Sequence, residues 1–424
     1  MWIKTRGVRL PSLKEPAASR AIRICSAREP ICLPVGYGGA SPCAPSTDIG
    51  QLLAKGEPVG QTPEGELPVF ASVTGRLQRL REMTHPLLGP LACVVLQPED
   101  TAQTDTPVLP DPHPQTETLS PAGICQIARM AGIIDELDGV PLADKLSQLS
   151  DLASATHLVA DATEAEPYAS SAWAVLNEAG EEVLAGLQLA ARACGMAHCH
   201  IAVMLPAKFR RPLIQRLGEE QVVSVPHRYP VDRLIPGSLR PACRIGVQAC
   251  LALYRAATLG ERQTGCVITV TGDAVANPQN VRIPFGISAK EVLELCGLAA
   301  DPSYVIFGDA MTGTAVADLD MPLLPGTTCL LALKAAPVPT TRPCIGCGRC
   351  ARVCHANLLP YEIVRRLENM HYERLPGLRP ELCDGCGACS HICPAGREVA
   401  VKVQEARQTA EGTILLKWGD DDDA

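Results

Sequence analysis

Apolar residues recur at helical spacing in three long segments of the chain, and short continuous apolar runs separate these segments. The helical pattern covers residues 121–134, 170–195 and 242–260, and the last two of these segments end on a glycine. The runs HLVADA and HCHIAVML, on either side of the second segment, are typical of buried strands. This alternation of helix and strand predicts an α/β domain over residues 119–260.

The pattern changes on both sides of this domain. Residues 1–118 are rich in Pro and Gly, contain short β-like runs such as EPICLPV and GRLQRL, and end in a polar, Pro-rich tract typical of a linker. Residues 262–336 contain strand-like runs around the helical segment SAKEVLELCGL. Residues 337–402 hold two cysteine motifs, and a tail at 403–424 ends in WGDDDDA, for which we expect disorder. The whole pattern predicts a multidomain protein that combines α/β and α+β domains.

Composition narrows the class of protein. The chain of 424 residues is too long for one typical core, so we expect two to four domains. A net charge of −8 argues against nucleic acid as the main partner, because phosphate binding calls for a basic face. No apolar run is long enough to span a bilayer, and the N-terminus has no secretory signal pattern. We therefore expect a cytoplasmic protein, or one held on the cytoplasmic face of a membrane through partners.

Twenty cysteines are unusual for such a chain. Eight of them lie in the two motifs, and the other twelve are scattered along the sequence. Disulfides would require an oxidising compartment, which nothing in the sequence indicates. We interpret the scattered cysteines as small buried apolar residues, and none is assigned a catalytic role.

The motifs CIGCGRCARVC and CDGCGACSHIC repeat the spacing C-x2-C-x2-C-x3-C. Three thiolates at this spacing, joined by a fourth from the other motif, are typical of proteins with two [4Fe–4S] clusters. Structural zinc is the alternative, but zinc sites usually use separated C-x2-C pairs. The expected ligands are Cys344, Cys347, Cys350 and Cys393 for cluster 1, and Cys383, Cys386, Cys389 and Cys354 for cluster 2.

Two further features of the motifs bear on the clusters. Glycines between the cysteines would let backbone N–H groups approach the sulfurs; they are Gly346, Gly348, Gly385 and Gly387. The first motif is followed by His355, where the second has Pro394. We expect this histidine to be a tolerated variant, or to change the turn or the hydrogen bonding at one cluster.

Three other stretches carry a family resemblance. They are TDIGQLLAKGEPVGQTPEGELPVFASVTGRLQRL, EAEPY at 164–168, and VITVTGDAVANPQNVRIPFG. Together with the cysteine motifs, and in this order, they resemble the C subunit of the Rnf electron-transport complex. The chain is also similar to the electron-transfer protein associated with proline reductase. The resemblance implies an N-terminal barrel-sandwich hybrid, a flavodehydrogenase-like α/β domain, a β-grasp module and a two-cluster ferredoxin domain.

The barrel-sandwich fold also occurs in carriers of biotin and lipoyl groups, which present a modified lysine at a hairpin tip. The corresponding turn here reads ASVTG, from Ala71 to Gly75, and contains no lysine. We therefore expect a structural or docking role for this domain.

The resemblance also implies FMN and NADH, which the family binds through a GxGGAGFP loop and a segment NGAECEPY. The loop reads AGIIDELDGVPLADKL here, with Asp135, Glu136 and Asp138 where phosphates would bind. The second segment reads DATEAEPY, and its Glu164, Glu166 and Tyr168 are the candidate remnant of a flavin pocket. This remnant is either a reduced pocket or a turn needed for folding. The acidic loop argues against phosphate binding, because like charges repel strongly in a partly buried site.

Three functions are therefore considered. The first is an electron-transfer protein that relays electrons through two [4Fe–4S] clusters to a reductase or a membrane complex. The second is an NADH-oxidising, FMN-dependent subunit, and the third is a scaffold or assembly module with structural clusters. The expected partners are redox proteins, either Rnf-type membrane subunits or a cytosolic reductase. No catalytic residue is assigned, because electron transfer needs no acid–base group.

Overall fold

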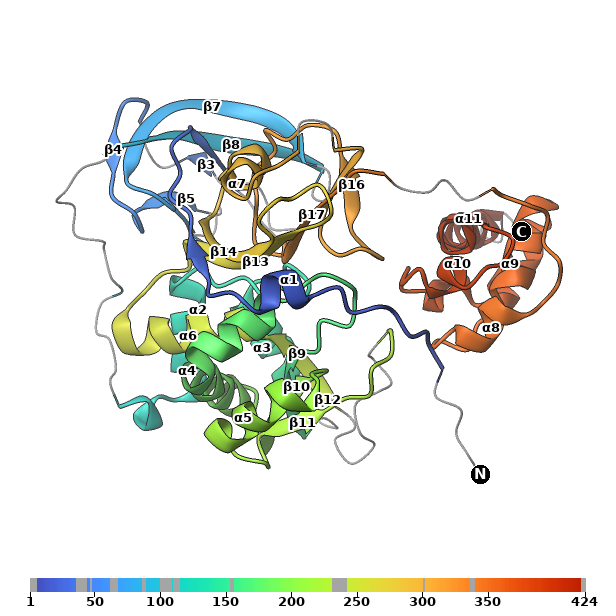
Figure 1. Cartoon of the computed structure of the whole chain (residues 1–424), viewed down its shortest axis with the longest axis horizontal. Coiled ribbons are helices and arrows are strands. Elements are labelled where there is room, and N and C mark those ends of the chain that lie inside the picture. The colour runs from blue at the N-terminus through green and yellow to red at the C-terminus, as the bar shows by residue number, and fades with distance from the viewer. Residues whose placement is uncertain are drawn as a thin grey trace.

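The structure is a computed structural model of the chain (Figure 1). It describes residues 6–35, 44–45, 48–61, 68–85, 89–99, 109, 115–152, 156–230, 242–299, 302–335 and 340–420. Most of the predicted linker, residues 100–114, lies outside the described part of the chain except for Leu109.

A six-stranded sheet, built mainly from residues 265–333, lies next to the N-terminal strands. Its strand order is β1-β14-β13-β17-β15-β16, and the helix α7 packs near it. The elements are β1 (Arg23–Ile24), β13 (Gly265–Thr271), β14 (Gln279–Pro284), β15 (Tyr304–Phe307), β16 (Thr314–Val316), β17 (Cys329–Leu333) and α7 (Ala289–Leu295). The first of these strands comes from the N-terminal segment, and it pairs in parallel with β14, more than 250 residues later in the chain. The helix α1 (Glu15–Ala18) also contacts this sheet.

Two smaller antiparallel sheets pack above this sheet in Figure 1. One has the order β2-β8-β7-β4 and the other β3-β5-β6. The strands are β2 (Ile31–Pro34), β3 (Ala44–Pro45), β4 (Leu52–Leu53), β5 (Pro58–Gln61), β6 (Val69–Phe70), β7 (Gly75–His85) and β8 (Gly89–Pro98). Apolar residues of these strands and of the six-stranded sheet, such as Leu33, Leu96 and Val281, form one continuous core. The N-terminal strands are therefore anchored by burial of apolar surface and not only by their own hydrogen bonds.

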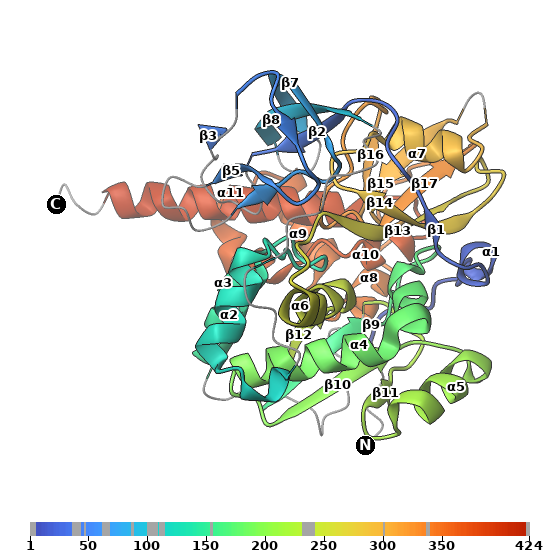
Figure 2. The same cartoon turned by 90° about the vertical axis from the view of Figure 1, so that its left-hand side faces the viewer.

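The α/β domain is built on a four-stranded parallel sheet with the order β11-β10-β9-β12. Its elements are α2 (Pro121–Met130), α3 (Leu142–Ser150), β9 (His157–Ala162), α4 (Ser171–Ala193), β10 (His198–Val203), α5 (Ala207–Leu217), β11 (Val222–Ser224), β12 (Ala242–Gly246) and α6 (Val247–Leu259), preceded by η1 (Thr116–Thr118). The predicted strands and helices of this region are present. The helices α4 and α6 lie side by side against the sheet (Figure 2).

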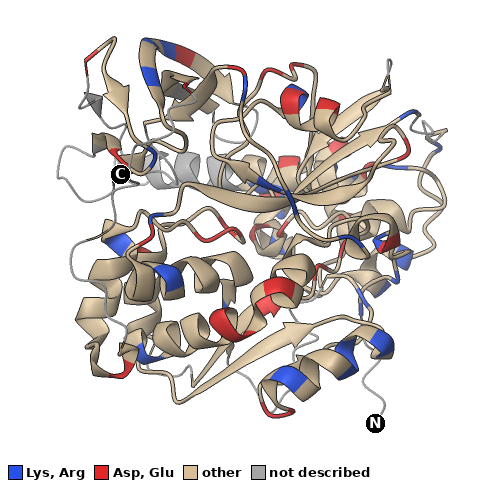
Figure 3. Cartoon of the chain, turned by 60° about the vertical axis from the view of Figure 1, so that its left-hand side comes forward, with Lys and Arg blue, Asp and Glu red and all other residues tan. Residues whose placement is uncertain are grey.

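Charge is spread unevenly over this domain. Acidic residues follow one another on α4, at Glu178, Glu181 and Glu182, and basic residues gather on the neighbouring α5 (Figure 3). The guanidinium of Arg216 on α5 pairs with Glu181 at 2.8 Å. Both side chains are more than a third exposed, so this pair contributes little to stability.

The cysteine-rich domain is a small helical unit at the right of Figure 1. Its elements are α8 (Arg349–Val353), α9 (Pro360–Glu368), η3 (Tyr372–Arg374), η4 (Pro376–Leu378), η5 (Pro380–Leu382), α10 (Ala388–His391) and α11 (Val399–Asp420). Apolar residues of α9 and α11, including Ile363 and Val403, pack against five of the motif cysteines.

The C-terminal tail differs from expectation. The sequence suggested that the cysteine-rich domain ends at residue 402. The helix α11 instead continues past this position and includes Trp418 and Gly419. The disorder expected for WGDDDDA is thus wrong for its first three residues, and residues 421–424 lie outside the described part. Acidic composition was a poor guide here because the start of α11 buries apolar residues, including Val403 and Ala406, against α9. Within the described residues, no helix is both long and apolar enough to cross a membrane.

Close packing of α4 on α6 depends on a glycine. A Cβ added at Gly186 would lie 1.8 Å from the backbone oxygen of Cys250 on α6. Replacing Gly186 with Ala should therefore force the two helices apart and lower the free energy of unfolding by about 1–3 kcal/mol. Urea denaturation followed by circular dichroism measures this. Gly377→Ala is the matched control, because nothing lies within 4 Å of its added Cβ; equal stability of the two variants would contradict the packing argument.

Candidate iron–sulfur and nucleotide sites

The two cysteine motifs form two similar turns. The glycines Gly346, Gly348, Gly385 and Gly387 all have φ between 66° and 79°, the left-handed region that residues with a Cβ rarely adopt. In each motif the second glycine directly precedes a short helix, α8 or α10, that carries the third cysteine. The repeated sequence thus produces a repeated backbone, and each turn bends the chain around its first three cysteines.

The thiols group across the motifs as well as within them. Charge–charge interactions link Cys354, the last cysteine of the first motif, to Cys383 and Cys389 of the second. Cys350 interacts in the same way with Cys344 of its own motif. Cys389 interacts in the same way with Cys350, so thiols of both motifs lie close together, and the crossed ligand sets predicted from the sequence stay a prediction.

The environment of these thiols suits a bound metal cluster. Burial raises the pKa of the Cys389 thiol to about 12 and raises the pKa values of the Cys350 and Cys383 thiols too. Buried thiolates without a cation would therefore be unstable, and an iron cluster supplies the positive charge that offsets this. The donor set and its burial fit an iron–sulfur cluster.

His355 makes a contact between the two motifs. Its Nε2 lies 2.6 Å from Oδ2 of Asp384, and the other carboxylate oxygen of Asp384 accepts a hydrogen bond from the backbone N–H of Cys386. Burial raises the pKa of Asp384, but the hydrogen bonds from His355 and from the Cys386 N–H, together with the charge interaction with His355, hold the pKa below its ordinary value. The residue that replaces proline after Cys354 therefore connects that cysteine to the second motif. The expectation for His355, a tolerated variant or a change of the turn or of the hydrogen bonding at one cluster, stays a prediction.

The cysteine-rich domain is fastened to the rest of the protein on the side of Cys354 and Cys386. The Tyr229 hydroxyl donates to the backbone oxygen of Cys386 at 2.6 Å. The guanidinium of Arg6 donates to the backbone oxygen of Cys354 at 3.1 Å, and the N–H of Gly7 donates to Val353. Two expected ligands of cluster 2 are thus held by groups from outside their own domain.

A cavity of about 440 Å³ lies on this same side, between the α/β domain and the second cysteine motif. Its lining includes Cys386, Tyr229 and Arg244. The lining also contains many carboxyl groups, from Glu136, Asp161, Glu164, Glu166, Asp309 and Asp384. Its size is within the range of ligand pockets, and its position beside Cys386 makes it the candidate nucleotide site.

Glu136 occupies the amino end of α6 within this site. Its two carboxyl oxygens accept the backbone N–H groups of Gln248 at 2.6 Å and Ala249 at 3.0 Å. A Cβ at Gly246 would lie 2.0 Å from the same carboxyl group, so the fit depends on glycine there. Free N–H groups at a helix start are the donors that bind phosphate in many proteins. Here the carboxyl group of Glu136, from the acidic loop, already accepts hydrogen bonds from two of these N–H groups.

The neighbouring Asp135 is fully buried and completes this arrangement. It accepts the N–H of Gly246 at 3.0 Å and binds the ammonium of Lys145 at 2.6 Å, and Lys145 also pairs with Asp138 at 2.7 Å. Burial, followed by the charge of Asp135, raises the pKa of Glu136 to about 8. The raised pKa means that a second negative charge beside Asp135 is unfavourable here. The negative charges of a phosphate would be unfavourable for the same reason. The residues at this end of the cavity therefore do not fit FMN phosphate.

The predicted remnant residues have separate roles. Glu164 is half-buried and caps the start of α4 by accepting the N–H groups of Ala172 at 2.9 Å and Trp173 at 3.3 Å. Glu166 accepts from the Tyr229 hydroxyl at 3.2 Å and from the Thr312 hydroxyl at 2.7 Å. Tyr168, with φ at 76°, does not line the cavity. Two of the three predicted residues, Glu164 and Glu166, therefore line the cavity. The hydrogen bonds of Glu164 hold the start of α4, and those of Glu166 hold Tyr229 and Thr312.

Sequence reasoning missed several residues of this site. Tyr229, Arg244 and Asp309 come from segments without a motif, and only the tertiary fold brings them to Glu166 and Cys386. Burial raises the pKa of Asp309 to about 7, and its Oδ1 has no hydrogen-bond partner in the part of the chain that the structure describes.

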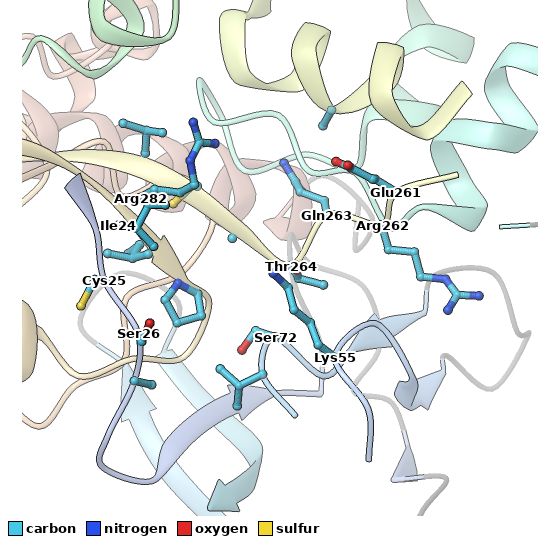
Figure 4. A pocket seen from close by; sticks show the side chains of 18 of the residues that line it. Ile24, Cys25, Ser26, Lys55, Ser72, Glu261, Arg262, Gln263, Thr264 and Arg282 are labelled. Atoms are coloured by element: carbon cyan, nitrogen blue, oxygen red, sulfur yellow. The ribbon is translucent and has the colours of Figure 1, made fainter. Parts of the chain in front are cut away.

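A larger cavity of about 930 Å³ lies away from the motif cysteines, where the N-terminal segment, the N-terminal sheets and α6 meet (Figure 4). Arginines line part of it, but Arg255 is already paired with Glu182 and Arg282 with Glu178. None of the eight motif cysteines reaches it. It therefore lies apart from the expected clusters.

Comparison with known proteins agrees with the cysteine geometry. The RnfC barrel sandwich hybrid domain matches residues 2–101, and the 4Fe-4S dicluster domain matches residues 343–407. These matches confirm the N-terminal domain and the iron–sulfur domain expected from the sequence.

Curated relatives extend the likeness over most of the chain. The chain is 27% identical to the C subunit of the Na(+)-translocating ferredoxin:NAD(+) oxidoreductase complex of Acetobacterium woodii, over 84% of this chain and 85% of that protein. It is 29% identical to the C subunit of the ion-translocating oxidoreductase complex of Pseudomonas aeruginosa, over 84% of this chain but about half, 49%, of that longer protein. A solved NAD+-reducing [NiFe]-hydrogenase is 18% identical, with a TM-score of 0.47, over 72% of this chain and 65% of that one.

The cysteine geometry and these matches define an iron–sulfur electron-transfer protein. Within that class the chain is RnfC-like, since it resembles the C subunits of ion-translocating oxidoreductase complexes over most of its length. The resemblance predicted from the sequence motifs is therefore confirmed.

The cysteine assignment predicts the effect of removing one ligand. Cys350→Ala should disrupt one cluster and leave the other detectable by electron paramagnetic resonance, so that iron falls from about eight to about four per chain. Anaerobic iron and sulfide analysis of the reconstituted protein measures this. Cys329→Ala is the control, because Cys329 is buried in the six-stranded sheet and should not affect iron content. An iron content of about eight in Cys350→Ala would mean that the ligand set is wrong.

The raised pKa of Glu136 predicts that the stability of the protein depends on pH. Its pKa is about 8 in the folded protein, against an ordinary value of 4.5, so between these values the folded state keeps a proton that the unfolded state has lost. Stability should therefore fall as the pH rises from about 4.5 to about 8, and Glu136→Gln should flatten this part of the curve. Urea midpoints at several pH values measure the difference from the wild type. Glu219→Gln, on the exposed surface, is the control and should leave the curve unchanged.

Proposed function

We propose that the chain is an electron relay with two [4Fe–4S] clusters, carried on a flavodehydrogenase-like scaffold that no longer holds a flavin phosphate. In this proposal the N-terminal sheets form the barrel-sandwich hybrid, residues 119–260 the flavodehydrogenase-like domain, and the six-stranded sheet a β-grasp module. The observation that carries the proposal is the carboxyl group of Glu136, which occupies the backbone N–H groups at the start of α6.

The clusters would be held by the cysteines predicted from the sequence. Cys344, Cys347, Cys350 and Cys393 would hold cluster 1, and Cys383, Cys386, Cys389 and Cys354 would hold cluster 2. When bound, the clusters supply one-electron transfer. The protein residues orient and shield them: Tyr229 and Arg6 hold the backbone of two cluster 2 ligands, and His355 connects the motifs through Asp384.

Electrons would come from a redox partner and pass to a reductase or to a membrane electron-transport complex. The names of the relatives support this, since they are subunits of ferredoxin:NAD(+) or ion-translocating oxidoreductase complexes. We also propose a place on the cytoplasmic face of a membrane, reached through partner subunits, which the ion-translocating complexes named for these relatives support.

The second candidate is an NADH-oxidising, FMN-dependent subunit. The cavity of about 440 Å³ beside Cys386 favours it, because an electron donor bound there would lie next to cluster 2. Glu136 opposes it, because its carboxyl group already occupies the N–H groups at the start of α6 that would otherwise bind a phosphate.

Anaerobic analysis of the purified, iron-reconstituted chain separates these candidates. We expect about eight iron and eight sulfide per chain, less than a tenth of an equivalent of FMN after incubation with excess FMN, and no bleaching of the clusters by NADH. Stoichiometric FMN with NADH-dependent bleaching would favour the second candidate and overturn the first. Clusters that dithionite does not reduce would instead favour a structural role, with the chain acting as a scaffold.

A further inference from the structure

The first cysteine motif has a basic surface on an acidic protein. From Thr340 to Pro360 the sequence contains three arginines and His355 but no aspartate or glutamate, whereas the whole chain has a net charge of −8. The arginines are Arg342, two residues before Cys344, and Arg349 and Arg352 on α8. Residues three apart on a helix are neighbours on one face, so the last two extend the same positive surface.

This surface is open to solvent. Cys344, Cys347, Arg342 and Arg349 are exposed, and Ile345 is 70% exposed between the two cysteines. Within the part of the chain that the structure describes, the guanidinium groups of Arg342, Arg349 and Arg352 form no ion pair or side-chain hydrogen bond. Their charge is therefore not neutralised by neighbouring groups of the protein.

The second motif differs in both respects. Cys389 is buried, and the nearby arginines are paired, Arg379 with Glu381 at 3.5 Å and Arg397 with Glu368. Tyr229 holds the Cys386 backbone, and a Cβ at Gly387 would lie 3.3 Å from the backbone oxygen of Met311. The second motif thus faces the body of the protein, and the exposed turn of the first motif, residues 342–349, is the part that a partner can reach.

We propose that the surface formed by Arg342, Ile345, Cys344, Cys347 and Arg349 is the docking site for a small acidic electron-carrier protein. This inference rests on the proposed relay function and adds the position and charge of its external partner. An exposed apolar residue between unpaired arginines gives the apolar centre and polar rim of a transient protein interface. The positive surface would attract an acidic carrier, which would exchange one electron with the cluster that Cys344, Cys347, Cys350 and Cys393 would hold.

Charge reversal tests the proposal on the cluster-loaded full chain. The variant replaces both Arg342 and Arg349 with Glu, and the probe is an acidic plant-type [2Fe–2S] ferredoxin. Calorimetric titration with the oxidised ferredoxin measures binding, and stopped-flow absorbance with the reduced ferredoxin measures one-electron transfer. We expect the wild type to bind and react in a manner that weakens as salt rises. Both the affinity and the second-order rate should fall at least tenfold in the variant.

A matched control reverses the same number of charges elsewhere. Arg79 and Arg81 are exposed on β7, in the N-terminal domain, and the variant with Glu at both positions should behave as the wild type does. The docking proposal is overturned if the control loses as much affinity as the motif variant, if the motif variant stays within twofold of the wild type, or if the ferredoxin neither binds nor reacts with the wild type.

Dithionite separates this outcome from failure of the relay itself. It is a small reductant that needs no docking site, and both clusters of all three proteins should be reduced by it, as measured by electron paramagnetic resonance. Reduction by dithionite together with an unchanged ferredoxin rate in the motif variant would refute the docking site alone. Clusters that dithionite does not reduce in the wild type would refute the relay function and the docking site together.

Discussion

The carboxyl group of Glu136 fixes the loop between α2 and α3 to the start of α6, and the ligand preference of the α/β domain depends on this contact. A helix start offers N–H groups that must be satisfied, and a nucleotide phosphate or a carboxyl group can do so. Here the chain supplies its own carboxyl group, and Asp135 with Lys145 completes the arrangement. The cavity beside Cys386 remains, but the end of it that Glu136 and its neighbours form does not suit a phosphate. In the proposed function this scaffold positions the cysteine-rich domain.

The polar contacts around Cys386 explain how that positioning is achieved. The single hydroxyl proton of Tyr229 is shared between two acceptors, the Glu166 carboxyl group at 3.2 Å and the Cys386 backbone oxygen at 2.6 Å. The N-terminal segment adds Arg6 and Gly7 from the other end of the chain. These bonds lie at the boundary between domains, so their energy orients one domain on the other. The first motif stays exposed as a result, with its arginines unpaired in the described part of the chain.

Sequence patterns predicted the elements of the α/β domain well, because helical and strand periodicities report burial on one face and survive without knowledge of the tertiary fold. They also predicted the cysteine turns, since the spacing and the glycines define the backbone locally. They failed at the tail, where α11 continues to Asp420 through an acidic sequence. The pairing of β1 with β14 was equally hidden, because strands of two residues carry no periodicity and their partner lies far away in the chain.

The sequence by itself determined the class of this protein. Eight cysteines at fixed spacing specify cluster ligation, and no other chemistry in the chain has so local a signal. The sequence also showed that the phosphate loop was acidic, but repulsion was the only consequence that could be argued from it. Only the tertiary structure decided that Glu136 reaches the start of α6, that Glu164 caps α4, and that Tyr229 meets Cys386. The contact of Glu164 joins residues that are eight positions apart in the chain, but the contacts of Glu136 and Tyr229 join residues more than 100 positions apart. Only the tertiary packing of the chain brings these distant residues together.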